Sequence, residues 1–194
     1  MSAHRLLIIA GTSGVGKSTL SARVASSLRF SKIVSTDTIR ETLRTQYDPE
    51  ERPALHRSSF EPAGSGVIED WHQTVKVLSE ATQAVVLRAA AKSSDLVLEG
   101  VHIIPGEAML EEWRKSGGEA CGVVLRVDDE ETHENFIKSR ERHNRNGVEH
   151  YLGNLHRIRE IQDCMVIDAE NSGWLSIDAS IDENPLGLIE DLFE

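Results

Sequence analysis

One segment near the N-terminus constrains the fold of this chain more than any other: IIAGTSGVGKSTLSARVASSL, residues 8–28. Within it, residues 11–18 match the pattern G-x-x-x-x-G-K-[S/T] in full, between an apolar run and an amphipathic run. Glycines let such a loop bend so that backbone N–H groups point at phosphate oxygens, and the helix that follows adds its positive end. A glycine-rich turn without a ligand is the alternative, but a strand before it and a helix after it favour a nucleotide.

The residues of this loop have separate predicted roles. Lys17 would reach the terminal phosphates of the nucleotide, and Ser18 would bind magnesium. The predicted nucleotide-binding residues are Gly11, Thr12, Ser13, Gly14, Val15, Gly16, Lys17, Ser18 and Thr19.

Strands and helices are expected to alternate along the chain. Apolar runs predict strands at residues 5–10, 32–36, 95–103, 121–127 and 174–178, with helices between them. This alternation predicts one α/β domain over residues 1–194, with a mostly parallel five-stranded sheet and helices on both faces. Ligands of such sheets bind beyond the carboxyl ends of the strands. The glycine loop, Asp37, Glu99 and Arg126 fall at or near such ends, so we expect them at one edge of the sheet.

The segment STDTIRE, residues 35–41, places an acid at the end of the second predicted strand. Asp37 stands at a junction from strand to helix, where an N-cap is favoured, and Arg40 follows one helical turn later. The carboxylate could take the proton of an acceptor hydroxyl, and the arginine could bind an anionic group of the same acceptor. The alternative is that Asp37 only caps the helix and Arg40 is solvated, but the phosphate loop favours a functional pair.

Residues 37–66 include an irregular stretch rich in proline, glycine and serine, which we expect to form an acceptor-binding insertion. Its segment LHRSSFE, residues 55–61, is either an ordinary surface loop or a site for a phosphate or carboxylate. The candidate ligands there are His56, Arg57, Ser58 and Ser59.

The segment LVLEGVH, residues 96–102, ends a predicted strand with an acid. That acid, Glu99, could support magnesium or its waters, as the second nucleotide motif of phosphate-loop proteins does. His102 could contact the substrate, although a lone histidine at such a place is more often structural.

Three arginines, Arg140, Arg142 and Arg145, lie in the segment RERHNRNG, on a predicted helix that breaks at Asn146 and Gly147. Phosphoryl transfer needs positive charge near the transferred group, and a mobile arginine-bearing segment can supply it. A solvated helix end is the alternative. We expect a lid over about residues 140–150, with Arg140 and Arg145 as catalytic residues beside Lys17 and Asp37, and Arg142 as a nucleotide ligand.

Composition narrows the choice of partners. The formal net charge of −11 argues against nucleic acid and against an anionic membrane surface. The apolar runs are too short for a transmembrane helix. Cys121 and Cys164 form neither a metal-binding nor a redox spacing, which predicts reduced thiols and a cytoplasmic location. The sequence leaves the oligomeric state open, with a homodimer among the choices.

Five segments, in chain order, resemble the 2-phosphoglycerate kinase family: GTSGVGKST, STDTIRE, LHRSSFE, LEGVHIIPG and IREIQD, from about residue 6 to residue 170. The resemblance implies a P-loop NTPase fold of the nucleoside-monophosphate-kinase type with a lid. It also implies Mg²⁺-dependent transfer of the γ-phosphate of ATP to 2-phosphoglycerate, which gives 2,3-bisphosphoglycerate. By position, Lys17 and Ser18 would serve ATP and Mg²⁺, Asp37 would lie beside the accepting hydroxyl, and Arg40 with the HRSS residues would bind the acceptor's anionic groups.

Archaeal members of that family carry an extra N-terminal regulatory module, which we expect to be absent because the first predicted strand begins at residue 5. From these motifs and the resemblance, the predicted acceptor is a small phosphorylated or acidic molecule. The alternatives are a kinase for another small acid or sugar, a nucleotide-controlled binding switch, and a nucleic-acid end kinase. Asp37 and the arginine cluster disfavour the switch, and the net charge disfavours the nucleic-acid enzyme.

Overall fold

The computed structural model describes residues 3–194, and its centre is a parallel sheet of five strands. The strands are β1 (Arg5–Ala10), β2 (Ile33–Ser35), β3 (Leu96–Gly100), β4 (Glu119–Arg126) and β5 (Leu175–Asp178). Their order across the sheet is β2-β3-β1-β4-β5, and each neighbouring pair is parallel. The predicted strand number, direction and approximate positions are confirmed.

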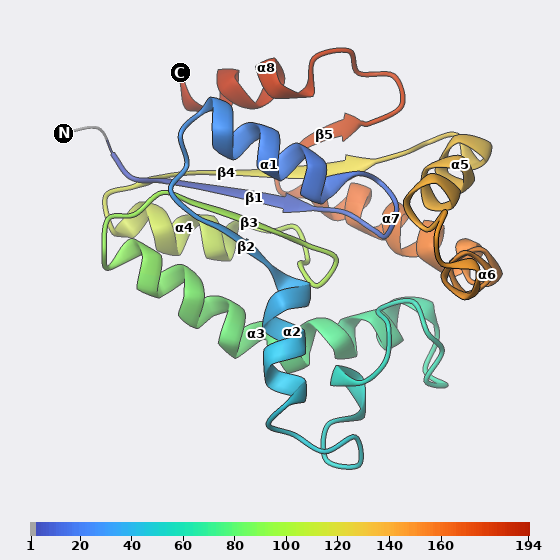
Figure 1. Cartoon of the computed structure of the whole chain (residues 1–194). Coiled ribbons are helices and arrows are strands. Elements are labelled where there is room, and N and C mark those ends of the chain that lie inside the picture. Colours follow the sequence, from blue (N-terminus) through green and yellow to red (C-terminus); the bar gives the residue numbers. More distant parts are fainter. Residues whose placement is uncertain (1–2) are drawn as a thin grey trace.

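Helices cover both faces of this sheet (Figure 1). They are α1 (Lys17–Ser27), α2 (Thr36–Arg44), α3 (Val67–Ala90), α4 (Glu107–Lys115), α5 (Glu130–Arg140), α6 (Arg145–Gly153), α7 (Leu155–Asn171) and α8 (Pro185–Glu190). Two short 3-10 turns, η1 (Pro53–Leu55) and η2 (Asp191–Phe193), complete the elements. Within residues 3–194, every helix is too short or too polar to cross a membrane.

The central strand β1 explains the two hydrophobic cores. Its side chains alternate between faces, and because both faces are covered, the strand is a continuous apolar run. Leu6 and Ile8 pack with residues of α3, α4 and α7, whereas Leu7 and Ile9 pack with residues of α1 and α8. The three tryptophans of the chain, Trp71, Trp113 and Trp174, are all buried.

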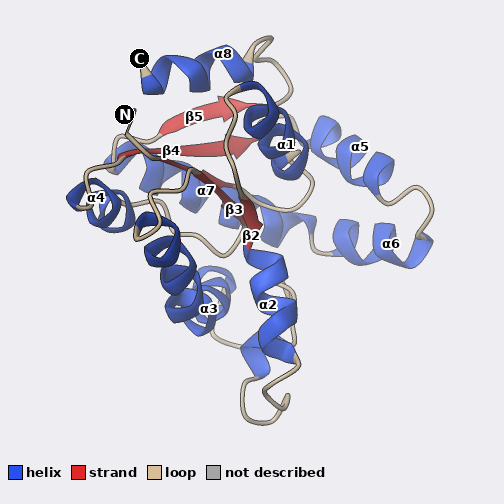
Figure 2. Ribbon diagram, turned by 60° about the vertical axis from the view of Figure 1, so that its left-hand side comes forward, coloured by secondary structure: helices blue, strands red, loops and turns tan. Residues whose placement is uncertain are grey.

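The carboxyl ends of the strands share one edge, where the phosphate loop, α2 and the α5–α6 pair lie. Figure 2 shows α2 and the α5–α6 pair as two separate projections from this end of the sheet. The phosphate loop and both projections thus lie at the edge where the alternation of strands and helices predicts a ligand.

Two local predictions were wrong. Asp37 does not cap α2: Ser35 has the extended backbone of an N-cap, and its Oγ accepts a hydrogen bond from the Asp37 N–H at 3.2 Å. The predicted helix break at Asn146 and Gly147 is also absent from the described structure, because α6 begins at Arg145 and runs through both residues. Asn144 starts this helix by accepting the Gly147 N–H at 3.1 Å.

Candidate active site

The predicted phosphate loop joins β1 to α1. Gly14 and Gly16 have φ angles of +90° and +89°, in the left-handed region that favours glycine. Lys17 Nζ donates a hydrogen bond to Thr12 O at 2.7 Å, so the lysine folds back over the loop. Beside the loop is a cavity of about 370 Å³, lined by Gly14, Gly16, Lys17, Ser18, Thr19, Phe136, Ser139 and Arg140.

Ser18 and Glu99 meet at the end of β3. The Ser18 hydroxyl donates to Glu99 Oε1 at 3.0 Å, and the glutamate is 5% exposed. A hydroxyl and a buried carboxylate are oxygen donors of the kind that Mg²⁺ prefers, and they stand directly beside the cradle. This donor set fits magnesium, and that Ser18 and Glu99 bind it stays a prediction.

The start of α2 rests directly on the end of β3. Thr36 is fully buried, and its Oγ1 lies 3.1 Å from His102 Nδ1. Gly100 makes this approach possible, because a Cβ there would lie 1.8 Å from Thr36 Oγ1. The contact fixes the backbone of α2 one residue before Asp37, and it therefore places that carboxylate at the sheet edge.

Asp37 and His102 form the next layer of this contact. Asp37 Oδ1 lies 3.7 Å from His102 Nδ1, and the carboxylate itself is 66% exposed, whereas the imidazole is fully enclosed. Burial lowers the pKa of His102 to about 4, outweighing the opposite effect of Asp37. The neutral, enclosed ring of His102 supports Thr36 and Asp37. Of the imidazole and the carboxylate, only the carboxylate of Asp37 faces open solvent.

Arg40 lies one turn along α2 from Asp37, as predicted, with its Nη1 4.0 Å from Asp37 Oδ1. Its Nε donates to Leu55 O at 3.1 Å, so the insertion holds the guanidinium in place. Its Nη2 lies 3.7 Å from Glu41 Oε1, so the two terminal nitrogens of Arg40 face two carboxylates of α2.

The insertion is anchored by a buried ion pair. Arg157 Nη2 donates to Asp70 Oδ2 at 2.9 Å, and the same carboxylate accepts the N–H groups of Ala63 and Ser65. These hydrogen bonds lower the pKa of Asp70, the bond from Ala63 first among them. The loop between η1 and α3 is thus fastened to both α3 and α7.

The HRSS residues mostly hold this insertion together. Arg57 donates to the carbonyls of Glu61 and Asp70 and to Gln73 Oε1, at 3.2, 2.8 and 2.9 Å. His56 Nε2 lies 3.0 Å from Tyr47 O, the Ser58 N–H donates to the Glu61 carboxylate, and Ser59 is buried. That these four residues bind the acceptor stays a prediction.

The three lid arginines occupy different places. Arg140 ends α5 beside the phosphate loop, and its guanidinium stacks 4.4 Å from the centre of the Tyr151 ring. Tyr151 in turn packs against Phe60 of the insertion. Arg145 is exposed and pairs with Glu149 along α6, and Arg142 Nε bonds His143. The structure thus brings Arg140 to the loop, and it leaves Arg142 and Arg145 on the surface.

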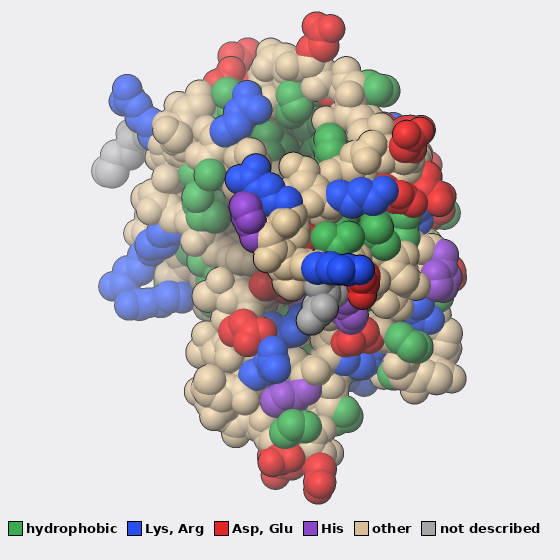
Figure 3. All heavy atoms as spheres, turned by 45° about the vertical axis from the view of Figure 1, so that its right-hand side comes forward, with side chains coloured by type: hydrophobic (Ala, Val, Ile, Leu, Met, Phe, Trp, Pro, Cys, Tyr) green, Lys and Arg blue, Asp and Glu red, His purple; other side chains and the backbone are tan. Residues whose placement is uncertain are grey.

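Electrostatics link the two sides of the site. Burial lowers the pKa of Lys17, the carboxylates of Glu99 and Asp37 raise it, and Arg140 lowers it. These residues come from α1, β3, α2 and α5, and they act on one ammonium group. Figure 3 shows Lys and Arg side chains in the middle of this face of an otherwise acidic protein.

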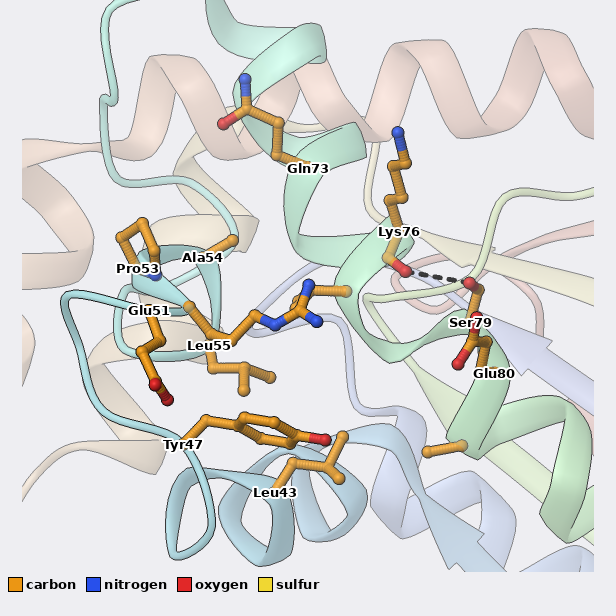
Figure 4. Close-up of a pocket in the computed structure, with 13 residues that line it drawn as sticks. Leu43, Tyr47, Glu51, Pro53, Ala54, Leu55, Gln73, Lys76, Ser79 and Glu80 are labelled. Carbon is orange, nitrogen blue, oxygen red and sulfur yellow. Dashed lines mark hydrogen bonds between the residues drawn. The ribbon is translucent and has the colours of Figure 1, made fainter.

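A second cavity, of about 530 Å³, lies between α2, η1 and α3. Leu43, Tyr47 and Leu55 form an apolar side of it, and Gln73 and Lys76 extend from α3 (Figure 4). Although it is larger than the cavity at the phosphate loop, none of its lining residues belongs to that loop. Through Leu55 and Gln73 it borders the groups that hold Arg40 and Arg57.

The sequence profile of the family described as an AAA domain matches residues 7–169, which include every site residue named above. The chain belongs to this AAA domain family. Within the matched range lie the phosphate loop, Asp37, Glu99 and the start of the lid.

Curated relatives of this AAA domain protein are named 2-phosphoglycerate kinase. One from Pyrococcus horikoshii is 27% identical over 97% of this chain and 64% of its own length. One from Methanopyrus kandleri is 31% identical over 85% of this chain and 53% of its own length. The chain thus spans a little over half to about two thirds of the length of these two relatives.

Solved structures of kinases share the fold. A shikimate kinase from Aquifex aeolicus superposes with a TM-score of 0.53 over 96% of this chain and 95% of its own, at 15% identity. A gluconokinase from Sinorhizobium meliloti superposes with a TM-score of 0.50 over 100% of this chain and 91% of its own, at 15% identity. These likenesses confirm the predicted P-loop kinase fold.

Sequence reasoning missed three residues of this AAA domain site: Thr36, Gly100 and His133. Gly100 carries a detectable signal, since a glycine inside an apolar strand indicates close backbone approach. Thr36 and His133 carry no such signal, because each gains its contact only when the sheet brings distant segments together.

Proposed function

We propose that this protein is an ATP-dependent kinase that transfers the γ-phosphate to the hydroxyl of 2-phosphoglycerate, giving 2,3-bisphosphoglycerate. One arrangement carries the proposal: the cavity lined by Lys17 and Arg140 lies at the same edge of the sheet as the exposed carboxylate of Asp37. A phosphate cradle and a solvent-facing carboxylate thus meet at one place. The names of the curated relatives support the choice of acceptor.

The reaction follows from these positions. The acceptor hydroxyl oxygen attacks the γ-phosphorus, the bond from that phosphorus to the β–γ bridging oxygen breaks, and ADP leaves. The hydroxyl proton passes to the Asp37 carboxylate, whose solvent exposure leaves it open to an acceptor. Lys17 and Arg140 stabilise the negative charge on the transferred group. His102 and Thr36 act as positioning residues, since they hold the segment that carries Asp37.

Magnesium would be held by Ser18 and Glu99, directly or through water. When bound, it neutralises charge on the β- and γ-phosphate oxygens. The Ser18–Glu99 contact also holds the first turn of α1 against β3, which keeps Lys17 beside the cradle.

Recognition of the acceptor would rest on Arg40 first. Its guanidinium faces Asp37 and is held by the Leu55 carbonyl, so it is preorganised for the carboxylate or phosphate of the acceptor. We propose residues 37–66 as the acceptor-binding insertion of a single kinase domain and residues 140–150 as its lid. We also propose that the protein acts on small molecules in the cytoplasm and binds neither nucleic acid nor membrane.

A transfer screen tests this function. The protein, Mg²⁺ and ATP labelled on the γ-phosphate are incubated with 2-phosphoglycerate, 3-phosphoglycerate, glycerate and simple sugars, and labelled products are separated. Label on 2-phosphoglycerate alone, absent with Lys17→Ala, supports the proposal. Label on another acceptor would make this a kinase for a different small acid or sugar, and nucleotide binding with no transfer would make it a switch.

A further inference from the structure

Helix α5 presents three residues to the phosphate loop at helical spacing. His133, Ile137 and Arg140 stand at positions i, i+4 and i+7, so they share one face of the helix. His133 Nε2 bonds Ser13, Ile137 lies against Gly14, and Arg140 lines the cavity at Lys17. One face of α5 thus lies along the phosphate loop from Ser13 to Lys17.

The contact of His133 is chemically unambiguous. Its side chain is fully buried, and Nε2 lies 2.8 Å from the Ser13 carbonyl oxygen. A carbonyl oxygen only accepts, so Nε2 carries the hydrogen and the neutral ring keeps its lone pair on Nδ1. Among the described residues, that buried Nδ1 has no hydrogen-bond partner. Burial lowers the pKa of His133, which keeps this form in place.

The bond also sets the direction of an N–H group in the loop. The Ser13 carbonyl and the Gly14 N–H belong to one planar trans peptide, so they point in opposite directions. With the carbonyl held toward α5, the Gly14 N–H is turned away from that helix. Gly14 adds a steric constraint, because a Cβ there would lie 2.5 Å from Ile137 Cγ1 and 3.2 Å from His133 Nε2.

We propose that His133 is a positioning residue of the phosphate loop: it locks the Ser13–Gly14 peptide in the orientation that receives the nucleotide phosphates and keeps the loop in register with Arg140. The inference rests on the proposed phosphoryl transfer for its purpose. Its structural content is independent of the acceptor, since it concerns only the loop and α5.

Two substitutions separate the hydrogen bond from packing. His133→Leu keeps much of the volume but has no donor, whereas the side-chain amide of His133→Gln can still reach the Ser13 carbonyl. His72→Leu is the matched control, because it removes a partly buried imidazole from α3, outside the loop contacts. ATP affinity is measured by calorimetry, kcat and KM by coupled assay, and folding by thermal denaturation.

We expect His133→Leu to remain folded and to bind ATP roughly tenfold more weakly, with His133→Gln and His72→Leu within about threefold of the wild type. Unchanged ATP affinity and kcat in a folded His133→Leu would overturn the inference. Equal losses in the Leu and Gln variants would overturn it too, since the donor would then be irrelevant.

Amide signals in nuclear magnetic resonance spectra separate this inference from the proposed function. If the wild type binds no ATP, the proposed function fails, and the loop itself still decides the role of His133. Shifted or broadened Ser13 and Gly14 amide signals in His133→Leu, restored in His133→Gln, support the lock. Signals identical in all three proteins refute it.

Discussion

Replacing Gly100 with alanine tests how α2 is set against β3. The added Cβ would lie 1.8 Å from Thr36 Oγ1, 2.7 Å from its Cβ and 2.8 Å from its Cγ2. Rotating the Thr36 side chain does not move its Cβ, so it cannot relieve the contact between that atom and the new Cβ at position 100. The backbone of α2 or β3 must therefore move. Gly100 is outside the left-handed region, so alanine fits its backbone and the clash is the whole effect.

The size of the effect follows from these distances. An ordinary contact begins near 3.4 Å, so Thr36 Oγ1 must retreat by about 1.6 Å (3.4 − 1.8) unless its rotamer changes. Overpacking of this kind costs about 1–3 kcal/mol of stability. Displacing the residue next to Asp37 by an ångström lowers kcat by on the order of 100-fold, while ATP affinity changes less.

Urea denaturation and transfer kinetics measure both effects. Gly153→Ala, at an exposed glycine whose added Cβ meets no atom within 4 Å, is the matched control and should keep full activity. In a Thr36→Gly background, which removes all three clashing atoms, Gly100→Ala should cost less than about 0.5 kcal/mol. Equal costs in both backgrounds, or wild-type kcat in Gly100→Ala, would refute this view of the α2–β3 contact.

Four further changes probe the site. Lys17→Ala should keep the fold, checked by circular dichroism, and lose at least about 100-fold in kcat because charge on the β- and γ-phosphates is no longer balanced. Arg140→Ala should lower kcat more than it weakens ATP binding, as steady-state kinetics and calorimetry can compare. Asp37→Asn should cut transfer by about 10²–10⁴-fold with little change in stability, because Ser35 rather than Asp37 caps α2; parallel losses of stability and activity would mark Asp37 as structural. Burial lowers the pKa of His102 from 6.5 to about 4, so between these pH values the unfolded chain binds a proton that the folded chain does not. The free energy of unfolding should therefore fall as the pH falls from 6.5 to about 4, and His102→Gln should reduce this pH dependence in urea titrations.

The features of the fold that the sequence predicts are those determined by residues close together along the chain. The conformation of the glycine loop could be predicted from its sequence, because its glycines adopt left-handed angles and the runs on either side form β1 and α1. The order of strands and helices likewise predicts a parallel sheet, whose shared carboxyl edge places Asp37 and Glu99 near the loop.

Both wrong predictions concerned the residue at which a helix begins. Ser35 and Asp37 both favour N-caps, and the extended end of β2 gives the position to the serine. Asn146 and Gly147 are typical of a turn, but the Asn144 cap begins α6 just before them. Such choices depend on where a strand or helix ends, which one sequence indicates only approximately.

The remaining site contacts depend on partners that are distant in sequence. Arg57 appears free for an anion until the fold brings Asp70 and Gln73 to its guanidinium. His133 reaches the Ser13 carbonyl because α5 follows β4, the neighbour of β1, and so lies beside the loop that follows β1. No spacing along the chain predicts either contact.

In the proposed reaction, phosphate held at residues 11–18 passes to a hydroxyl beside Asp37. Phosphorus nuclear magnetic resonance of protein, Mg²⁺, ATP and 2-phosphoglycerate measures this transfer directly. We expect ADP and 2,3-bisphosphoglycerate to appear in equal amounts, and neither to form with Asp37→Asn at the wild-type rate. Release of inorganic phosphate without a new phosphate ester, or equal transfer rates in the two proteins, would contradict transfer at Asp37.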